Sequence, residues 1–176
     1  MATKQIIVGG GCFWCTEAVF ERLNGVSDVE NGYANGTIPN PDYQMVCRGD
    51  TGYAEVVKIT YDDHIIDLDT LFDIFFATHH PTQLNRQGAD RGTQYRSCIC
   101  YEEEETHEAA KRAISRAQKV HSAPIVTTLE PLENYYPAEE YHQDYYQKNP
   151  MQGYCMAVIP PKIQKLMEKF GDSLSF

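Results

Sequence analysis

Two cysteines stand where a short apolar strand is predicted to give way to a helix. Residues 5–8 are a β-branched run, three glycines follow, and the next four residues are Cys12-Phe13-Trp14-Cys15. A thiol at the start of a helix lies beside unpaired backbone N–H groups and the positive end of the helix dipole, which favour the thiolate. We therefore predict that Cys12 is an accessible, reactive nucleophile. The competing interpretation is a buried structural cysteine, the usual fate of a free thiol.

The spacing of Cys12 and Cys15 is also that of dithiol redox sites, because residues three apart lie one turn along a helix. Two other classes of protein therefore stay open: a thiol–disulfide oxidoreductase using this pair, and a redox sensor or zinc-binding module. Zinc sites usually need paired C-x-x-C units, and the other four cysteines do not supply a second one. Of these, Cys98 and Cys100 share one face of a predicted strand, where we expect them to pack as small apolar side chains.

The composition narrows the partners and the compartment. Asp and Glu number 25 and Lys and Arg 15 among 176 residues, a formal net charge of −10. Such a surface is a poor partner for nucleic acid or an anionic membrane, and no stretch approaches the roughly 20 apolar residues of a membrane helix. The first residues do not resemble a signal peptide. We expect a cytoplasmic monomer, whose six cysteines are mostly reduced thiols.

Helical and strand patterns alternate along the chain without a strict βαβ rhythm. Helices are predicted over residues 13–23, 67–77, 102–120, 137–148 and 162–170, with strands over 5–8, 26–33, 53–61, 96–101 and 125–129. The segments 34–52 and 79–95 are rich in turn formers and read as loops, and Pro160-Pro161 as a break. This mixture favours one α+β domain, residues 1–176, over a doubly wound sheet.

Four segments resemble peptide methionine sulfoxide reductases of type A. They are GCFW at 11–14, DTGYAEVV at 50–57, QGADRGTQYRS at 87–97, and YPAEEYHQDY with KNP at 136–150. One short signature would be weak, but four matches in the family's order are highly specific. The resemblance implies a two-layer, ferredoxin-like α+β fold with a mixed sheet. It also implies an enzyme that reduces methionine S-sulfoxide, free or in proteins, as repair under oxidative stress.

The resemblance assigns catalytic roles to single residues. Cys12 matches the nucleophile that attacks the sulfoxide sulfur and becomes a sulfenic acid. Glu55 matches the acid that gives the departing oxygen its proton, a role that needs burial to raise the pKa of its carboxyl. Tyr43 and Tyr95 match phenols that donate hydrogen bonds to that oxygen. Taken singly, a glutamate is more often an exposed side chain and a tyrosine a packing residue.

Other matched positions would bind the substrate. Phe13 and Trp14 match the family's apolar pocket for the S-methyl group, and sulfur–aromatic contacts are favourable by roughly 0.3–1.5 kcal/mol each. Asp90 lies in the matched loop and is expected to help shape the site. His142 and Glu139 lie in the matched late segment and are expected to support the site from outside it.

A second thiol must convert the sulfenic acid to a disulfide, which an external dithiol protein such as thioredoxin would reduce. The family usually takes this thiol from its C-terminal region, and Cys155 matches such a position in a segment, about 150–176, that we expect to be partly mobile. Glycine is usual in the family where this chain has Cys15. We therefore expect Cys155 to resolve the sulfenic acid and keep Cys15 as the alternative. No step of this chemistry requires a metal, flavin or nicotinamide.

Overall fold

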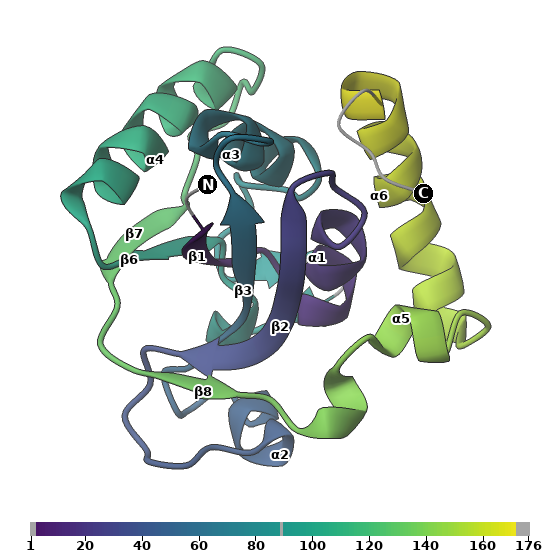
Figure 1. Cartoon of the computed structure of the whole chain (residues 1–176). Helices are drawn as coiled ribbons and strands as arrows, with labels where there is room; N and C mark the ends of the chain where they lie inside the picture. The colour runs from purple at the N-terminus through teal and green to yellow at the C-terminus, as the bar shows by residue number, and fades with distance from the viewer. Residues whose placement is uncertain (1–2, 89, 172–176) are drawn as a thin grey trace.

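The computed structural model describes residues 3–88 and 90–171, and within them a curled six-stranded sheet forms the centre of a mixed α+β domain (Figure 1). Its strands, in the order β7-β6-β1-β3-β2-β8, are Thr128–Pro131, Cys98–Tyr101, Thr3–Gly9, Ala54–Asp62, Val26–Ala34 and Tyr135–Pro137. Neighbours are antiparallel except β6 and β7, which are parallel. A separate two-stranded sheet pairs β4, Arg86–Gln87, with β5, Asp90–Arg91.

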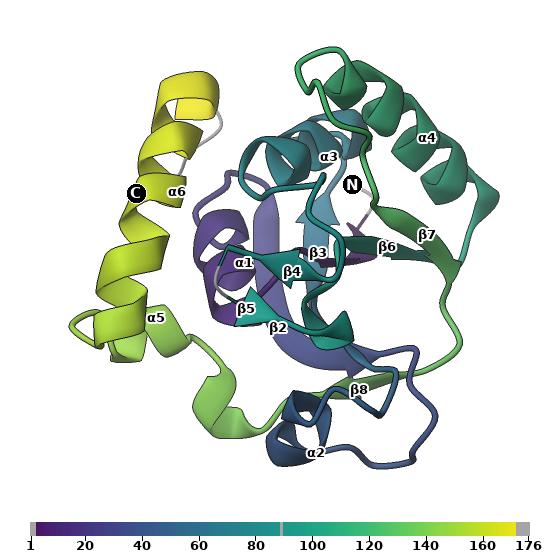
Figure 2. The ribbon, with the colours of Figure 1, turned by 180° about the vertical axis from the view of Figure 1, so that it is seen from behind.

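Six α-helices and two 3₁₀ turns accompany these strands in the described residues. The helices are α1 Phe13–Phe20, α2 Tyr43–Cys47, α3 Leu68–Ala77, α4 Glu104–Gln118, α5 Tyr145–Lys148 and α6 Gly153–Phe170, and the 3₁₀ turns are Thr93–Tyr95 and Glu140–His142. Seen from behind, α6 runs along the outer side of α1, and α3 lies next to α4 (Figure 2). The predicted helices at 67–77 and 102–120 and the strands at 5–8, 26–33 and 53–61 are confirmed within one to three residues.

The main core lies between the sheet and the helices, and it fixes the strand that leads to Cys12. Val8 in β1, Val57 in β3 and Ile99 in β6 are adjacent across the sheet and completely buried. A smaller apolar cluster lies on the opposite face of the sheet, where Leu132 and Tyr135 pack against it. Its members are Ile7, Ala34, Ala54, Val56, Cys98 and Cys100. The prediction that Cys98 and Cys100 pack as small apolar side chains is therefore confirmed.

The predicted helix over 137–148 is wrong. Residues 135–137 instead form β8 and pair with β2, and Asp144 adopts a left-handed backbone with φ of +54°, which interrupts a helix. Hydrogen bonds to distant segments replace the helix: the Ala138 N–H donates to the carbonyl of Asn31, and the Asp144 N–H donates to the buried carboxyl of Glu17. Tertiary partners for the backbone thus outweighed a favourable local helix pattern.

Two further differences concern a loop and the C-terminal segment. The predicted loop at 34–52 contains the short helix α2, which Asp42 caps by accepting a hydrogen bond from the Met45 N–H at 2.8 Å. The predicted break at Pro160 and Pro161 is absent, since α6 continues through both prolines. Each proline costs the helix one N–H donor, and the buried side chains of α6 hold it against the core.

Among the described helices, none is both long and apolar enough to cross a bilayer.

Truncating a side chain of the central sheet should lower the stability of the whole domain. Ile99 is completely buried on β6, so we expect Ile99→Ala to reduce the free energy of unfolding by about 2–5 kcal/mol through lost burial and a cavity. Val120→Ala is the control, because Val120 is 79% exposed, and it should change stability by less than about 0.5 kcal/mol. Urea unfolding followed by circular dichroism measures both, and equal effects would contradict this account of the core.

Candidate active site

Cys12 lies between the end of β1 and the first turn of α1. The chain turns there through Gly11, whose φ is +96° and whose missing Cβ would lie 2.6 Å from a side-chain carbon of Gln87. Only glycine combines this backbone with that approach. Cys12 itself is 8% exposed, so the prediction of an accessible thiol is wrong. The three glycines serve close packing around the thiol instead of opening a path to it.

The environment of Cys12 raises the pKa of its thiol well above the ordinary value. Burial is the main cause, and the neighbouring Cys15 and Glu55 add to it. The Trp14 backbone N–H donates a hydrogen bond to the sulfur, as expected at a helix start, and opposes the shift. Burial raises the pKa of Cys12 by more than this hydrogen bond lowers it. In the resting protein Cys12 is therefore a thiol, and its proton has to move during any nucleophilic attack.

Glu55 supplies a buried acid beside this thiol. The side chain is 1% exposed on β3, and its Oε1 accepts a hydrogen bond from the Phe13 N–H at 3.2 Å. Its Oε2 has no partner among the described residues. Burial raises the pKa of Glu55 to about 8, with a further contribution from the charge of Asp90. The carboxyl is therefore protonated at neutral pH, and it carries a proton with no competing acceptor.

Tyr43 and Tyr95 lie around the same carboxyl, from the first residue of α2 and the end of the 3₁₀ turn at 93–95. Burial raises the pKa of both phenols, and the negative charge that Glu55 would carry raises them further. Both hydroxyls therefore stay protonated donors at every physiological pH. The structure thus brings Cys12, Glu55, Tyr43 and Tyr95 together, although the sequence spreads them over more than 80 positions.

Phe13 and Trp14 belong to a larger aromatic cluster than the sequence suggested. Phe13 is 1% exposed and packs against Tyr33 and Tyr43, with ring centroids 5.7 and 6.3 Å away. Trp14 is partly exposed and stacks on Tyr145 at 3.8 Å with 6° between the planes. Phe13 thus forms the floor of the cluster, and Trp14 with Tyr145 forms its outer face.

His142 and Glu17 hold this cluster in place. The Trp14 indole N–H donates to His142 Nδ1 at 3.0 Å, which fits the expectation that His142 supports the site from outside it. Glu17 accepts the backbone N–H groups of Asp144 and Tyr145 at 2.9 and 3.3 Å, and burial raises its pKa to about 7. The sequence analysis missed Glu17, although an acidic residue inside an apolar helical turn was a visible signal.

Glu139, the other outer candidate, joins two tyrosines of the site. Its carboxylate accepts the Tyr33 hydroxyl at 2.9 Å and the Tyr43 backbone N–H at 3.0 Å. It therefore fixes the start of α2, from which the Tyr43 side chain extends.

Cys15 lies one helical turn after Cys12, and both line the same cavity. The neighbouring Cys12 thiol lowers the pKa of Cys15 against the effect of burial. The Tyr154 hydroxyl lies 3.7 Å from the Cys15 Sγ and donates to the Asp90 carboxylate. Asp90 therefore contributes to the site through Tyr154. A cavity of about 130 Å³ opens onto both sulfurs, and residues of α6 form its outer wall.

Cys155 lies deeper in the protein than expected. The segment predicted to be mobile is helical over residues 153–170, and residues 172–176 lie outside the described part of the chain. Cys155 is completely buried in the first turn of α6, where its N–H bonds the side chain of Gln152 at 2.9 Å. Of the two candidates for the resolving thiol, Cys15 lines the same cavity as Cys12, whereas Cys155 does not.

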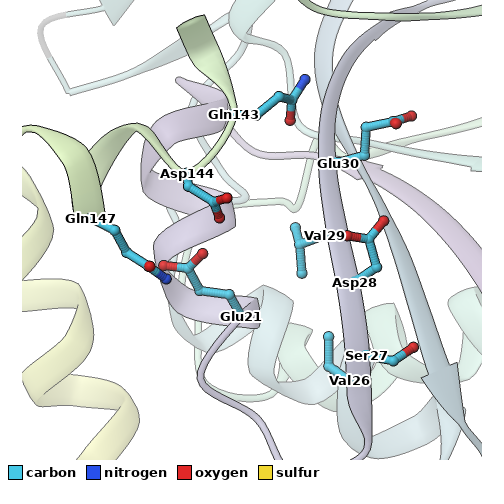
Figure 3. A pocket seen from close by; sticks show the side chains of 9 residues that line it. All are labelled: Glu21, Val26, Ser27, Asp28, Val29, Glu30, Gln143, Asp144 and Gln147. Carbon is cyan, nitrogen blue, oxygen red and sulfur yellow. The ribbon is translucent and has the colours of Figure 1, made fainter. Parts of the chain in front are cut away.

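A second cavity, of about 260 Å³, lies at the opposite end of α1 and is acidic (Figure 3). Carboxylates of Glu21 and Asp144 face it from one side, with Asp28 and Glu30 on β2 across from them. No thiol lines it, so it is not the place of the redox chemistry. Within the described residues, the two groups of three side chains that lie close enough to share an ion, Glu17–Glu21–Asp144 and Glu104–His107–Glu108, contain no cysteine. These groups therefore give no support to a zinc site with cysteine ligands.

A buried thiol beside a protonated carboxyl, with a second thiol one helical turn away, defines a thiol-dependent oxidoreductase. The family model described as peptide methionine sulfoxide reductase matches residues 4–174. The chain belongs to the peptide methionine sulfoxide reductase family, and it is accordingly an enzyme that reduces methionine sulfoxide.

Close relatives and solved structures agree with this assignment. The chain is 56% identical over 173 residues to peptide methionine sulfoxide reductase MsrA of Erwinia tasmaniensis, covering 97% of both chains. It is 54% identical over 175 residues to MsrA of Deinococcus radiodurans, covering 98% of this chain and 85% of the relative. Reduced Mxr1 from Saccharomyces cerevisiae superimposes with a TM-score of 0.80 at 38% identity, covering 87% of this chain and 89% of that one. Mxr1 in complex with Trx2 gives 0.57 at 26% identity, covering 81% and 84%.

Proposed function

We propose that Cys12 attacks the sulfur of methionine S-sulfoxide while Glu55 protonates the oxygen. The observation that carries this assignment is the geometry of Glu55: a buried, protonated carboxyl held by the Phe13 N–H, whose second oxygen has no hydrogen-bond partner among the described residues. A carboxyl of this kind can donate its proton to a bound sulfoxide, because no described protein group accepts it. Proton donation by a positioned acid contributes typically 10²–10⁴-fold to a rate.

The first step balances with these two residues alone. Glu55 gives its proton to the sulfoxide oxygen and recovers one from the Cys12 thiol, whose sulfur bonds the substrate sulfur. The protonated oxygen leaves that sulfur as hydroxide and bonds the Cys12 sulfur, while the new S–S bond breaks and its electron pair stays on the methionine sulfur. The products are the thioether methionine and Cys12 sulfenic acid, so methionine sulfur is reduced by two electrons and the cysteine is oxidised by two. Transfer of the thiol proton within the site explains how a cysteine with a raised pKa can act as the nucleophile.

Tyr43 and Tyr95 would stabilise the oxygen while it carries developing charge, because their phenols are donors already fixed in place. Phe13 and Trp14 would receive the S-methyl group, supported by the stacking of Tyr145 and the bond to His142. Asp90 would act through the Tyr154 hydroxyl that it orients. Each of these contacts would be strongest in the transition state and would contribute to kcat.

The second step would use Cys15. Its sulfur bonds the sulfur of Cys12 sulfenic acid, the S–O bond breaks, and the hydroxyl leaves as water, taking up the proton that ionisation of the Cys15 thiol releases. The cavity that both sulfurs line and the lowered pKa of Cys15 support this assignment, whereas Cys155 is completely buried in the core. Cys155 then takes the role of a later exchange partner.

Removing Cys15 should stop turnover, and removing Cys155 should slow it much less. With thioredoxin as the reductant and methionine S-sulfoxide as the substrate, we expect Cys15→Ser to lose about 10²-fold or more in kcat, because its sulfenic acid has no adjacent thiol. We expect Cys155→Ser to stay within about fivefold of the wild type. The sulfoxide-dependent consumption of reduced thioredoxin measures both rates. A dead Cys155→Ser variant beside an active Cys15→Ser variant would reverse the assignment.

Thioredoxin is the proposed reductant of the disulfide. The support comes from the solved complex of Mxr1 with Trx2, to which this chain is similar. A net transfer of two electrons from a dithiol would restore both cysteines. The proposed substrates include free and protein-bound methionine sulfoxide, in keeping with a repair role under oxidative stress, and the monomeric state and cytoplasmic location stay predictions.

We also infer that the core is two-layered and ferredoxin-like. The supporting observation is the order β6-β1-β3-β2 of antiparallel strands, connected along the chain as strand, helix, strand, strand, helix, strand with α1 and α3 as the helices. The remaining strands, β7 and β8, would be additions at the two edges.

A further inference from the structure

Lys162 lies on α6, and the two proposed reaction steps do not use its ammonium group. Its Nζ donates a hydrogen bond to the carbonyl of Thr78, just beyond the end of α3, at 2.8 Å. In the described residues no carboxylate lies within ion-pair distance of this ammonium, in contrast to Lys4, Lys58 and Lys111 on the surface. A partly buried positive charge without a carboxylate partner is costly, which suggests that it acts on a group that becomes negative.

The group nearest to that description is Cys15. Lys162 and Cys15 together line the 130 Å³ cavity beside Cys12, and they meet again in the narrow space behind it, which Thr78 and His79 close. Lys162 and Cys15 therefore lie on the walls of the same two cavities, between α1 and α6. Figure 2 shows the arrangement of the two helices, with α6 lying along α1.

We propose that Lys162 is a positioning residue for the resolving thiol, and that its ammonium holds the Cys15 sulfur ready as a thiolate for attack on Cys12 sulfenic acid. The inference rests on the proposed function of Cys15. It separates the roles of the two thiols: Cys12 remains a thiol until a substrate arrives, and Cys15 carries the negative charge. An opposite charge within about 4–6 Å favours the charged form of a group.

The other charged and titratable groups around Cys15 have opposite effects on the ionisation of its thiol. They are Cys12 just before α1, His79 and His80 after α3, Asp90 on β5, Tyr154 and Lys162 on α6, and Glu55 on β3. The Tyr154 hydroxyl, which donates to Asp90, and the neighbouring Cys12 thiol both favour the Cys15 thiolate, whereas the negative charge of Asp90 opposes it. Lys162 is the only lysine or arginine among these groups, all of them described residues. Burial lowers the pKa of its ammonium, and the negative charge of a Cys15 thiolate opposes that shift, so removal of Lys162 should change the ionisation of Cys15 most.

The competing explanation is that Lys162 only fastens α6 to α3 through Thr78. Three variants separate the two explanations. Lys162→Met removes the charge and keeps the apolar stem, and Lys162→Arg keeps the charge. Lys169→Gln removes a charge from the exposed face of the same helix as the matched control.

The first readout is the pH dependence of Cys15 alkylation by iodoacetamide in fully reduced enzyme without a sulfoxide, followed by peptide mass spectrometry. We expect Lys162→Met to shift the midpoint for Cys15 upward by about one pH unit, a loss of about tenfold in thiolate at pH 7. Lys162→Arg and Lys169→Gln should keep the wild-type midpoint. Identical midpoints for the Met variant and the wild type would overturn the proposal.

The second readout is a single turnover with methionine S-sulfoxide and no reductant. Methionine release should stay within about twofold of the wild type in Lys162→Met, while disulfide formation should slow about tenfold and the sulfenic acid should accumulate for trapping by dimedone. If Lys162→Arg lost as much as Lys162→Met, the residue would be a structural fastener and the proposal would be wrong. If the wild type released no methionine, the proposed function would fail instead, whereas the alkylation result, which needs no substrate, would still decide the role of Lys162.

Discussion

Replacing Cys12 with serine should abolish sulfoxide reduction, with kcat/KM falling by about 10⁴-fold or more. The hydroxyl is a far weaker nucleophile than sulfur, and it cannot form the sulfenic acid on which the later steps depend. Serine is nearly isosteric with cysteine, so the packing around this buried position should be retained. Thermal unfolding should confirm that the variant is folded, and the loss of thioredoxin-dependent turnover with methionine S-sulfoxide measures the effect.

The other cysteines provide the controls for this experiment. Cys47 is exposed, and Cys47→Ser should leave kcat/KM within about twofold of the wild type. Cys98→Ala tests a buried thiol outside the site and should lower stability while sparing activity, because it belongs to the cluster on the opposite face of the sheet. A Cys12→Ser variant with a tenth or more of the wild-type activity would exclude Cys12 as the nucleophile.

Replacing Glu55 with glutamine should reduce kcat/KM by about 10²–10⁴-fold, the usual contribution of a positioned general acid. Glutamine keeps the size of the side chain and an oxygen that can accept the Phe13 N–H, but it has no proton to give to the sulfoxide oxygen. Binding of a non-reducible methionine analogue should change little. A loss in kcat/KM that stayed within about threefold would contradict the role of Glu55 as the acid.

The pH profile gives a second test of Glu55. Its active form is the protonated one, and its pKa is about 8, so the wild-type activity should fall as the pH rises through 8. The pKa of Cys12 lies well above its ordinary value, so its ionisation does not account for a change near pH 8. The comparison with Glu55→Gln isolates the acid, and only the wild type should show the descending limb. An alkaline limb of equal size in both proteins would assign it to another group.

The same pKa shift predicts how stability depends on pH. The pKa of Glu55 is higher in the folded protein than its ordinary value of 4.5, and Glu17 behaves alike with a pKa of about 7. The folded state therefore binds these protons more tightly than the unfolded state. Their contribution to stability is fully present below pH 4.5 and is lost as the pH rises through 7 to 8. Glu55→Gln should weaken this alkaline loss.

Local patterns in the sequence were sufficient for the central strands and the long helices. Apolar residues at 68, 71, 72 and 75 repeat with helical spacing, and α3 follows them. The late segment shows the limit of this approach. Residues 137–148 carry a good helical pattern, but their backbone groups bond to Asn31 and Glu17, which lie more than 100 positions away. Partners at that distance cannot be inferred from local periodicity.

The site was predictable in its members but not in its arrangement. The resemblance gave Cys12, Glu55, Tyr43 and Tyr95, which the structure brings together. The burial of Cys12 was not predicted, because the three glycines suggested open space where Gln87 approaches closely. Lys162 was also missed, since its distance of 150 positions from Cys12 and its place after two prolines gave no sign that α6 returns to the thiols.

The most direct test of the central claim is one turnover of fully reduced enzyme with one equivalent of methionine S-sulfoxide and no reductant. Remaining thiols are alkylated and the peptides are mapped by mass spectrometry. The account predicts one equivalent of methionine and a disulfide between Cys12 and Cys15. A disulfide between Cys12 and Cys155 formed at the same rate as methionine would contradict the assigned resolving thiol, and six reduced cysteines without methionine would contradict the role of Cys12 itself.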